Sequence, residues 1–389
     1  MTAASAKAGE SPVPPKDQVA FLLNIQRLLQ EGSFVATYKF ALLHALADLA
    51  VSLGSEKNGA APLHLPLPLI GAKFVDYYWR QAAKYPGRPG QEKPGHVPIL
   101  ASVAVSENRY VSRLFQAEVL FQNTDRQAGI VREVFEARER FDGRYGDLRS
   151  DARSYRALVA KTTALVTKMP LWKLQTVGGE HAEFLYENHR LVDGGIVLKP
   201  GVAYCLRTFH RLITELVRSR WADFVRQLPR NGPAVGKTDL HEFLFGVARA
   251  DLSAYRPILA EFQKGDCFYC AKSLGAAPAV DHFVPWSRYP FDLGHNLVLA
   301  HPACNAAKSD HLAALRHLDR FCTRNATSGP ALARAFDTAH LVSDLEVTRK
   351  VTQWAYAQAH RSGADVWDAG KRLVSLEAGW GARGWLEQL

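Results

Sequence analysis

Apolar residues recur every three to four positions along most of the first 260 residues, the spacing that places them on one face of an α-helix. This pattern predicts helices over residues 19–30, 34–54, 73–85, 106–121, 127–141 and 152–168. Ser33 is a candidate N-cap of the second helix, and Gly54 is a candidate C-terminal stop. The Gly- and Pro-rich stretches at 55–68 and 86–95 predict loops.

The hydrophobic period changes between residues 170 and 199, where short aromatic or β-branched runs are separated by glycines. These runs predict a small antiparallel sheet. A long helix is then expected over 201–228, a linker over 228–240, and a further helix over 240–262. Helical patterns return after Asp310 and continue to the end, with glycine-containing breaks near 329 and 363–383.

The expected 201–228 helix has two different faces. Leu206, Phe209, Ile213, Leu216 and Val217 share one face, and Arg207, Arg211 and Arg218 line the opposite one. The arginines form either a solvated surface stripe or a set of phosphate contacts that would release counterions from nucleic acid. The sequence does not choose between these two readings.

Composition narrows the class of protein and its partners. The 389 residues carry a formal net charge of +10, which favours a polyanionic partner, either nucleic acid or an anionic surface, and charge alone does not choose between the two. No run approaches the eighteen or so apolar residues of a membrane span, and the N-terminus lacks the apolar core of a secretory signal. A membrane partner is therefore not expected, and a reducing cytoplasm is the expected location.

Three of the five cysteines crowd into residues 267–304, which indicates metal binding rather than disulfides. Cys267 and Cys270 form a C-x2-C knuckle, and His301 and Cys304 form a second pair of the same spacing. Two such turns supply four ligands for a tetrahedral structural zinc ion. The alternative is that His301 and Cys304 are simply packed residues.

The segment around these knuckles resembles the HNH endonuclease family, whose core is a ββα-metal fold. The resemblance covers about residues 262–312 and rests on the two knuckles, Asp281-His282, Asn296 before "LVLA", Asn305 and Lys308. Two positions depart from the usual family pattern. His301 stands in place of a third cysteine, and Asn305 stands where the last histidine often lies, although both residue types are accepted metal ligands.

Cleavage of a phosphodiester requires a base for water, a Lewis acid and clamps on the phosphate. His282 is the expected base because it alone among the histidines follows an acid at the end of an apolar strand. Asp281 and Asn305 offer oxygen donors for one catalytic Mg²⁺ or Mn²⁺ ion, which in the family is separate from the zinc. Asn296 is expected to brace the loop that carries His282 through its side-chain amide.

The expected roles of the remaining polar residues of this segment follow from their positions in the sequence. Lys308 and Arg288 are candidate phosphate contacts, or else ordinary surface residues. His295 precedes Asn296 on an extended segment and therefore points away from it, so it is expected to be a bystander, as are His311 and His317.

The sequence thus predicts a mostly α-helical protein with a small ββα-metal module. The expected parts are a disordered tail (1–16), a helical N-terminal domain with a small sheet (17–230), the HNH module (240–312) and a helical C-terminal extension (313–389). The expected function is metal-dependent hydrolysis of DNA, in restriction or anti-phage defence, with a second copy of the chain or a defence protein as partner. The alternatives are a zinc-stabilised nucleic-acid-binding module without catalysis, and a nuclease that acts on RNA.

Overall fold

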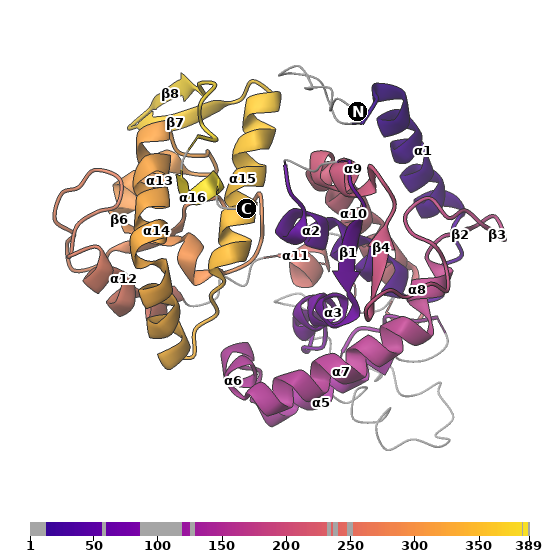
Figure 1. The fold of residues 1–389 in the computed structure, drawn as a ribbon. Helices are drawn as coiled ribbons and strands as arrows, with labels where there is room; N and C mark the ends of the chain where they lie inside the picture. The colour runs from indigo at the N-terminus through magenta and orange to yellow at the C-terminus, as the bar shows by residue number, and fades with distance from the viewer. Residues whose placement is uncertain are drawn as a thin grey trace. The chain divides into compact units, whose positions relative to one another are not determined.

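The computed structural model describes residues 13–56, 60–85, 119–124, 129–231, 235, 240–246, 252–382 and 384–387 (Figure 1). The chain forms two compact units. The first comprises residues 1–50 and 58–247, and the second comprises residues 51–57 and 248–389. In the described part of the chain, no helix combines the length and the apolar character needed to cross a membrane.

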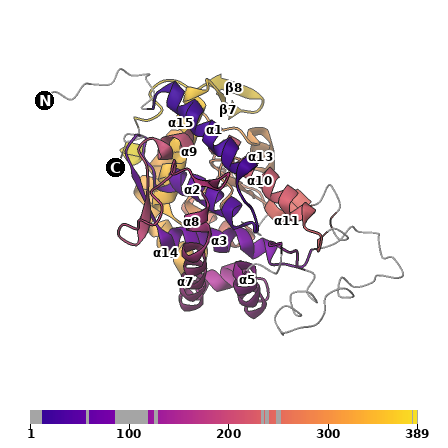
Figure 2. The ribbon, with the colours of Figure 1, turned by 90° about the vertical axis from the view of Figure 1, so that its right-hand side faces the viewer.

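The first unit is built mainly from helices. They are α1 (Pro15–Glu31), α2 (Tyr38–Leu53, whose last turn belongs to the second unit), α3 (Leu67–Gln81), α5 (Gly129–Arg140), α6 (Tyr145–Ser150), α7 (Ala152–Lys168), α8 (Pro170–Lys173), α9 (Val202–Thr208), α10 (His210–Gln227) and α11 (Leu240–Phe245). Helices α3, α5 and α7 pack against one another (Figures 1 and 2). The core contains large aromatic side chains, among them Tyr78 and Trp221, whose ring centroids lie 5.4 Å apart.

Several helix boundaries differ from the sequence expectation. Val13 is buried and α1 begins at Pro15, so the expected disordered tail does not extend to residue 16. Ser33 does not cap α2, because Ala36 pairs with Asn123 as an antiparallel bridge and keeps this segment extended. Residues 106–118 of the expected 106–121 helix lie outside the described residues, and 119–124 are not helical.

The strands of the first unit also pair differently from the expected local sheet. Strand β1 (Leu63–Pro66), within the expected 55–68 loop, pairs antiparallel with β4 (Gly195–Leu198). Strands β2 (Thr176–Val177) and β3 (Glu180–His181) form a separate two-stranded hairpin. Helix α3 starts six residues earlier than expected. Pro66, the last residue of β1, is its N-cap, and Pro68 lies in its first turn, where proline fits a helix.

The second unit contains the ββα element. Strands β5 (Ala279–His282) and β6 (Leu297–Ala300) pair antiparallel and are followed by α13 (Pro302–Lys308). The other elements of this unit are the 3₁₀ helices η2 (Leu252–Tyr255) and η3 (Gly294–Asn296), and helices α12 (Arg256–Phe262), α14 (Leu315–Thr338), α15 (Leu345–Arg361) and α16 (Gly384–Glu387). The Phe283 and Phe321 rings stack at 3.9 Å in its core.

Two C-terminal expectations are wrong. The extension is not purely helical, because β7 (Asp365–Ala369) and β8 (Arg372–Ser375) form a hairpin whose turn contains Gly370 at φ +52°. Gly329 does not break a helix, because α14 continues through it and through Pro330. A Cβ atom at position 329 would lie 2.7 Å from the Leu345 side chain, so the glycine allows α14 and the start of α15 to approach closely.

Candidate metal centre and nuclease site

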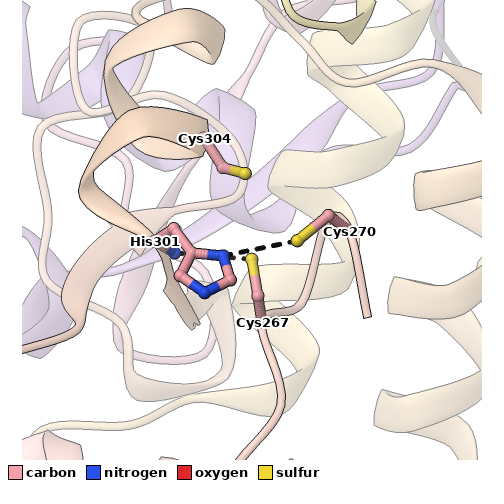
Figure 3. Close-up of side chains that lie close together, drawn as sticks. All are labelled: Cys267, Cys270, His301 and Cys304. Atoms are coloured by element: carbon pink, nitrogen blue, oxygen red, sulfur yellow. Dashed lines mark hydrogen bonds between the residues drawn. The ribbon is translucent and has the colours of Figure 1, made fainter. Parts of the chain in front are cut away.

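The sulfur and imidazole ligands expected from the two knuckles converge. Candidate ligand atoms of Cys267, Cys270, His301 and Cys304 all lie within 4.8 Å of one another (Figure 3). The first two follow α12 on a tight turn closed by the hydrogen bond from Ala271 N to Cys267 O. His301 is the N-cap of α13, and Cys304 lies in the first turn of that helix. The set is chemically and spatially suited to a four-coordinate structural zinc ion.

Contacts around the ligands prepare them for a cation. His301 Nε2 lies 3.0 Å from the carbonyl oxygen of Ser273 and donates to it, so Nδ1, 3.3 Å from Cys270 Sγ, carries the free lone pair. Burial raises the pKa of the Cys267 thiol, but hydrogen bonds from neighbouring backbone N–H groups outweigh it and lower that pKa to about 7. Burial and the two other cysteines raise the pKa of Cys304 to about 12. A divalent cation would favour the thiolate at all three positions.

Asp281 is held from two sides in the interior of the second unit. The Tyr269 hydroxyl donates to its Oδ2 atom, and Lys308 Nζ lies 3.0 Å from the same oxygen. Lys308 is fully buried and also donates to the carbonyl oxygen of His282 at 2.9 Å. Burial lowers the pKa of Lys308, and Asp281 acts in the opposite direction. The buried ion pair therefore fixes both the carboxylate and the end of β5.

His282 is the last residue of β5, and its ring contacts a residue that the sequence reasoning missed. The Nε2 atom lies 2.8 Å from Asp292 Oδ1. Asp292 lies in the loop between the strands, four residues before Asn296. The sequence feature that could have drawn attention to Asp292 is its position as the one acidic residue in "YPFDLGHN". Its spacing from His282 does not by itself indicate a contact.

Asn296 ties the loop after β5 to the start of β6. Its Oδ1 atom accepts from Val284 N at 2.9 Å, and its Nδ2 atom donates to Val284 O at the same distance. The backbone of Asn296 also accepts from Phe283 N at 2.8 Å. Asn296 thus holds Val284 through its buried side-chain amide and Phe283 through its backbone carbonyl. Asn305 is half-buried on α13, three residues before Lys308.

Two of the histidines set aside as bystanders have structural contacts. His295 is buried, bonds the carbonyl oxygen of Gly329 at 3.0 Å and meets the Phe336 ring edge-on. His317 is buried, bonds Asp368 O at 2.8 Å and stacks on Trp367. Burial lowers the pKa of both rings, which favours their neutral forms. His311 is half-buried just after α13.

The basic residues proposed as phosphate contacts occupy different environments. Arg288 is half-buried, whereas the ammonium of Lys308 is directed at Asp281 rather than at solvent. Arg207 is 3% exposed and donates to Ala50 O, so it is not part of an exposed stripe with Arg211 and Arg218. The expected 201–228 helix is interrupted at Phe209, which separates Arg207 on α9 from the other two on α10.

A ββα element with paired Cys/His knuckles and an Asp-His pair at the end of its first strand is the arrangement that the resemblance to HNH endonucleases implies for residues 262–312. The family model described as HNH endonuclease accordingly matches residues 267–314. A second model, described as domain of unknown function (DUF8808), matches residues 18–244. That match spans more than half of the chain, and the protein belongs to this family. No curated protein and no solved structure matches the chain.

Proposed function

We propose that the protein is a metal-dependent HNH endonuclease that hydrolyses phosphodiester bonds of DNA. The observation that carries the proposal is the placement of His282 at the end of β5, on a ββα element built over the Cys267–Cys304 metal cluster. A histidine on an exposed loop would lack the backbone contacts that fix His282, whose carbonyl oxygen accepts from Lys308 Nζ. The net charge of +10 is consistent with a nucleic-acid substrate.

In this proposal each candidate site residue has a separate role. His282 accepts a proton from the attacking water. Asn296 fixes the loop behind it, and Arg288 contacts a phosphate. Lys308 positions Asp281 instead of binding DNA, which revises the role expected from the sequence.

Asp281 and Asn305 would hold the catalytic divalent ion. The Oδ2 atom of Asp281 is engaged by Tyr269 and Lys308, so Oδ1 is the donor for an ion, and an asparagine carbonyl is a second hard ligand. When bound, Mg²⁺ or Mn²⁺ would stabilise the charge on the leaving oxygen. The zinc ion would be structural only.

A zinc-stabilised nucleic-acid-binding module without catalysis is the second candidate. The 3.0 Å contact between Lys308 and Asp281 favours it, because the ammonium already neutralises the carboxylate that a catalytic cation would use. RNA as substrate is a further alternative. Restriction or anti-phage defence in the cytoplasm is the proposed role, with the DUF8808 region as the targeting or regulatory part.

Nicking of supercoiled plasmid tests the proposal. Zinc-loaded wild type should convert the plasmid to open-circular or linear form with Mg²⁺ or Mn²⁺, and EDTA should stop the reaction. His282→Ala should lower the rate at least about 100-fold and leave DNA binding in a gel-shift assay intact. His311→Ala is the matched control, because it removes a histidine of the same unit to which no catalytic role is assigned.

The alternatives predict different results. Cleavage by His282→Ala at the wild-type rate contradicts the assigned base. A folded, zinc-loaded wild type that binds DNA but cleaves neither plasmid, single-stranded DNA nor RNA supports the binding module. Cleavage of RNA alone transfers the proposal to an RNA substrate.

A further inference from the structure

The contact between Asp292 and His282 goes beyond the residues of the HNH pattern. Asp292 Oδ1 lies 2.8 Å from His282 Nε2, and the two side chains are 30% and 13% exposed. Both are therefore largely shielded from water, which strengthens a charge-assisted hydrogen bond. Because Asp292 occupies Nε2 of the candidate base, only Nδ1 is left to accept a proton.

The loop that presents Asp292 is anchored on both sides. Leu293 is buried and its N–H donates to Phe291 O at 3.1 Å, while Gly294 N donates to Val342 O at 3.0 Å. A Cβ atom at Gly294 would lie 2.7 Å from the Phe336 ring, so the backbone is pressed against α14 at this point. The position of Asp292 is consequently set by the packing of the loop and not by its own side chain alone.

The backbone of His282 is fixed independently of Asp292. Its carbonyl oxygen accepts from Lys308, and the two residues after it are held by Asn296. Rotation of the imidazole about its side-chain bonds is what these contacts leave undetermined. The hydrogen bond to Asp292 removes that rotational freedom. It also selects the tautomer with hydrogen on Nε2, because a carboxylate accepts only from a protonated nitrogen.

We propose that Asp292 is a positioning residue that orients the His282 ring and leaves Nδ1 as the nitrogen that accepts the proton from water. This inference rests on the proposed nuclease function. As the water oxygen bonds to phosphorus, its proton moves to Nδ1 and the bond from phosphorus to the leaving oxygen breaks. The leaving oxygen takes a proton from solvent, and the Asp292 carboxylate stabilises the transient imidazolium.

Nitrogen NMR of protein labelled with ¹⁵N-histidine tests the contact without any activity measurement. At a pH where His282 is neutral, the wild type should show its Nε2 protonated and its Nδ1 unprotonated, with the signals assigned by their loss in His282→Ala. Asp292→Leu should abolish this single tautomer and give the averaged signals of a mobile imidazole. An unchanged tautomer in Asp292→Leu overturns the proposal.

Steady-state kinetics with supercoiled plasmid separate positioning from other roles. Asp292→Leu should lower kcat on the order of 100-fold with little change in KM, and Asp292→Asn, which keeps an acceptor oxygen, should lose less. Asp337→Asn, at an exposed position of the same unit, is the control and should retain wild-type kcat. Zinc content and circular dichroism establish that each variant is folded, and Asp292→Asn is the fallback if Asp292→Leu is not.

The remaining outcomes are decisive. If both Asp292 variants cleave at the wild-type kcat, the positioning role is wrong and the proposed nuclease stands. If their main defect is a raised Mg²⁺ concentration for half-maximal rate, Asp292 is an ion ligand and the proposal is overturned. If the wild type itself does not cleave, the nuclease function fails, while the NMR result still decides the Asp292 contact.

Discussion

Replacement of Lys308 by methionine would leave Asp281 without its buried counter-ion. The methionine side chain would occupy much of the same space but supply no donor to Asp281 Oδ2 or to the carbonyl oxygen of His282, which Lys308 contacts at 3.0 and 2.9 Å. The side chains of Lys308 and Asp281 are only 0% and 9% exposed, so water cannot take the place of the lost ammonium. The Tyr269 hydroxyl would be the remaining donor in these contacts.

The expected cost follows from this burial. Removing one partner of a buried ion pair typically costs about 3–5 kcal/mol, because it leaves an uncompensated charge in the interior. For a unit of this size, such a loss corresponds to a fall in melting temperature of about 10 °C. The second unit should carry the loss, because both residues lie in it.

Thermal and urea unfolding of zinc-loaded protein, followed by tryptophan fluorescence, measure the effect. Lys371→Met removes a lysine from the exposed turn of the β7–β8 hairpin and should change stability by less than about 0.5 kcal/mol. The double variant Lys308→Met/Asp281→Leu should recover much of the stability, because an apolar pair carries no unpaired charge. A Lys308→Met protein that unfolds at the wild-type temperature would refute the buried ion pair.

Two further predictions concern the metal centre and the first unit. His301→Ala, or chelation of the metal, should release about one zinc per chain, as measured by elemental analysis. Either change should also lower the melting temperature, as measured by calorimetry, together with any activity. An inactive variant that retains zinc and wild-type stability would instead make His301 catalytic. Burial lowers the pKa of His44 to about 3 and neither ring nitrogen has a hydrogen-bond partner among the described residues. The unfolded chain therefore binds a proton at His44 that the folded chain does not, and stability should fall as the pH drops from about 6.5 towards 3. His44→Phe should flatten this acid dependence in urea titrations, and an unchanged slope would contradict the burial argument.

The ββα element was predictable because its signals are local. A knuckle needs two ligands at fixed spacing, and a strand of four apolar residues after Asn296 allows few alternatives, so β6 begins and ends at the expected residues. The ligand cluster follows from the same spacing, since His301 and Cys304 lie on the first turn of one helix. Short-range geometry carries this information, and tertiary packing is needed only to bring the two knuckles together.

Features set by distant contacts were not predictable. Burial of Lys308 and Arg207 depends on which elements cover them, and an amphipathic pattern treats both as surface residues. Pairing of β1 with β4 joins residues more than 120 positions apart, so no local pattern indicates it. The β7–β8 hairpin did have a local signal, since Gly370 and Lys371 separate two runs that contain Val366, Trp367, Leu373 and Val374.

Tyr269 provides a physical link between the metal centre and the candidate catalytic residues. It lies inside the first knuckle, between Cys267 and Cys270, and its hydroxyl donates to Asp281. Its ring is buried edge-on against Trp367 of the C-terminal hairpin, so it cannot follow a displaced knuckle without disturbing that packing. Loss of zinc would free the knuckle backbone and withdraw a donor from Asp281. The structural metal and the site should therefore fail together, even though the zinc ion has no role in the proposed chemistry.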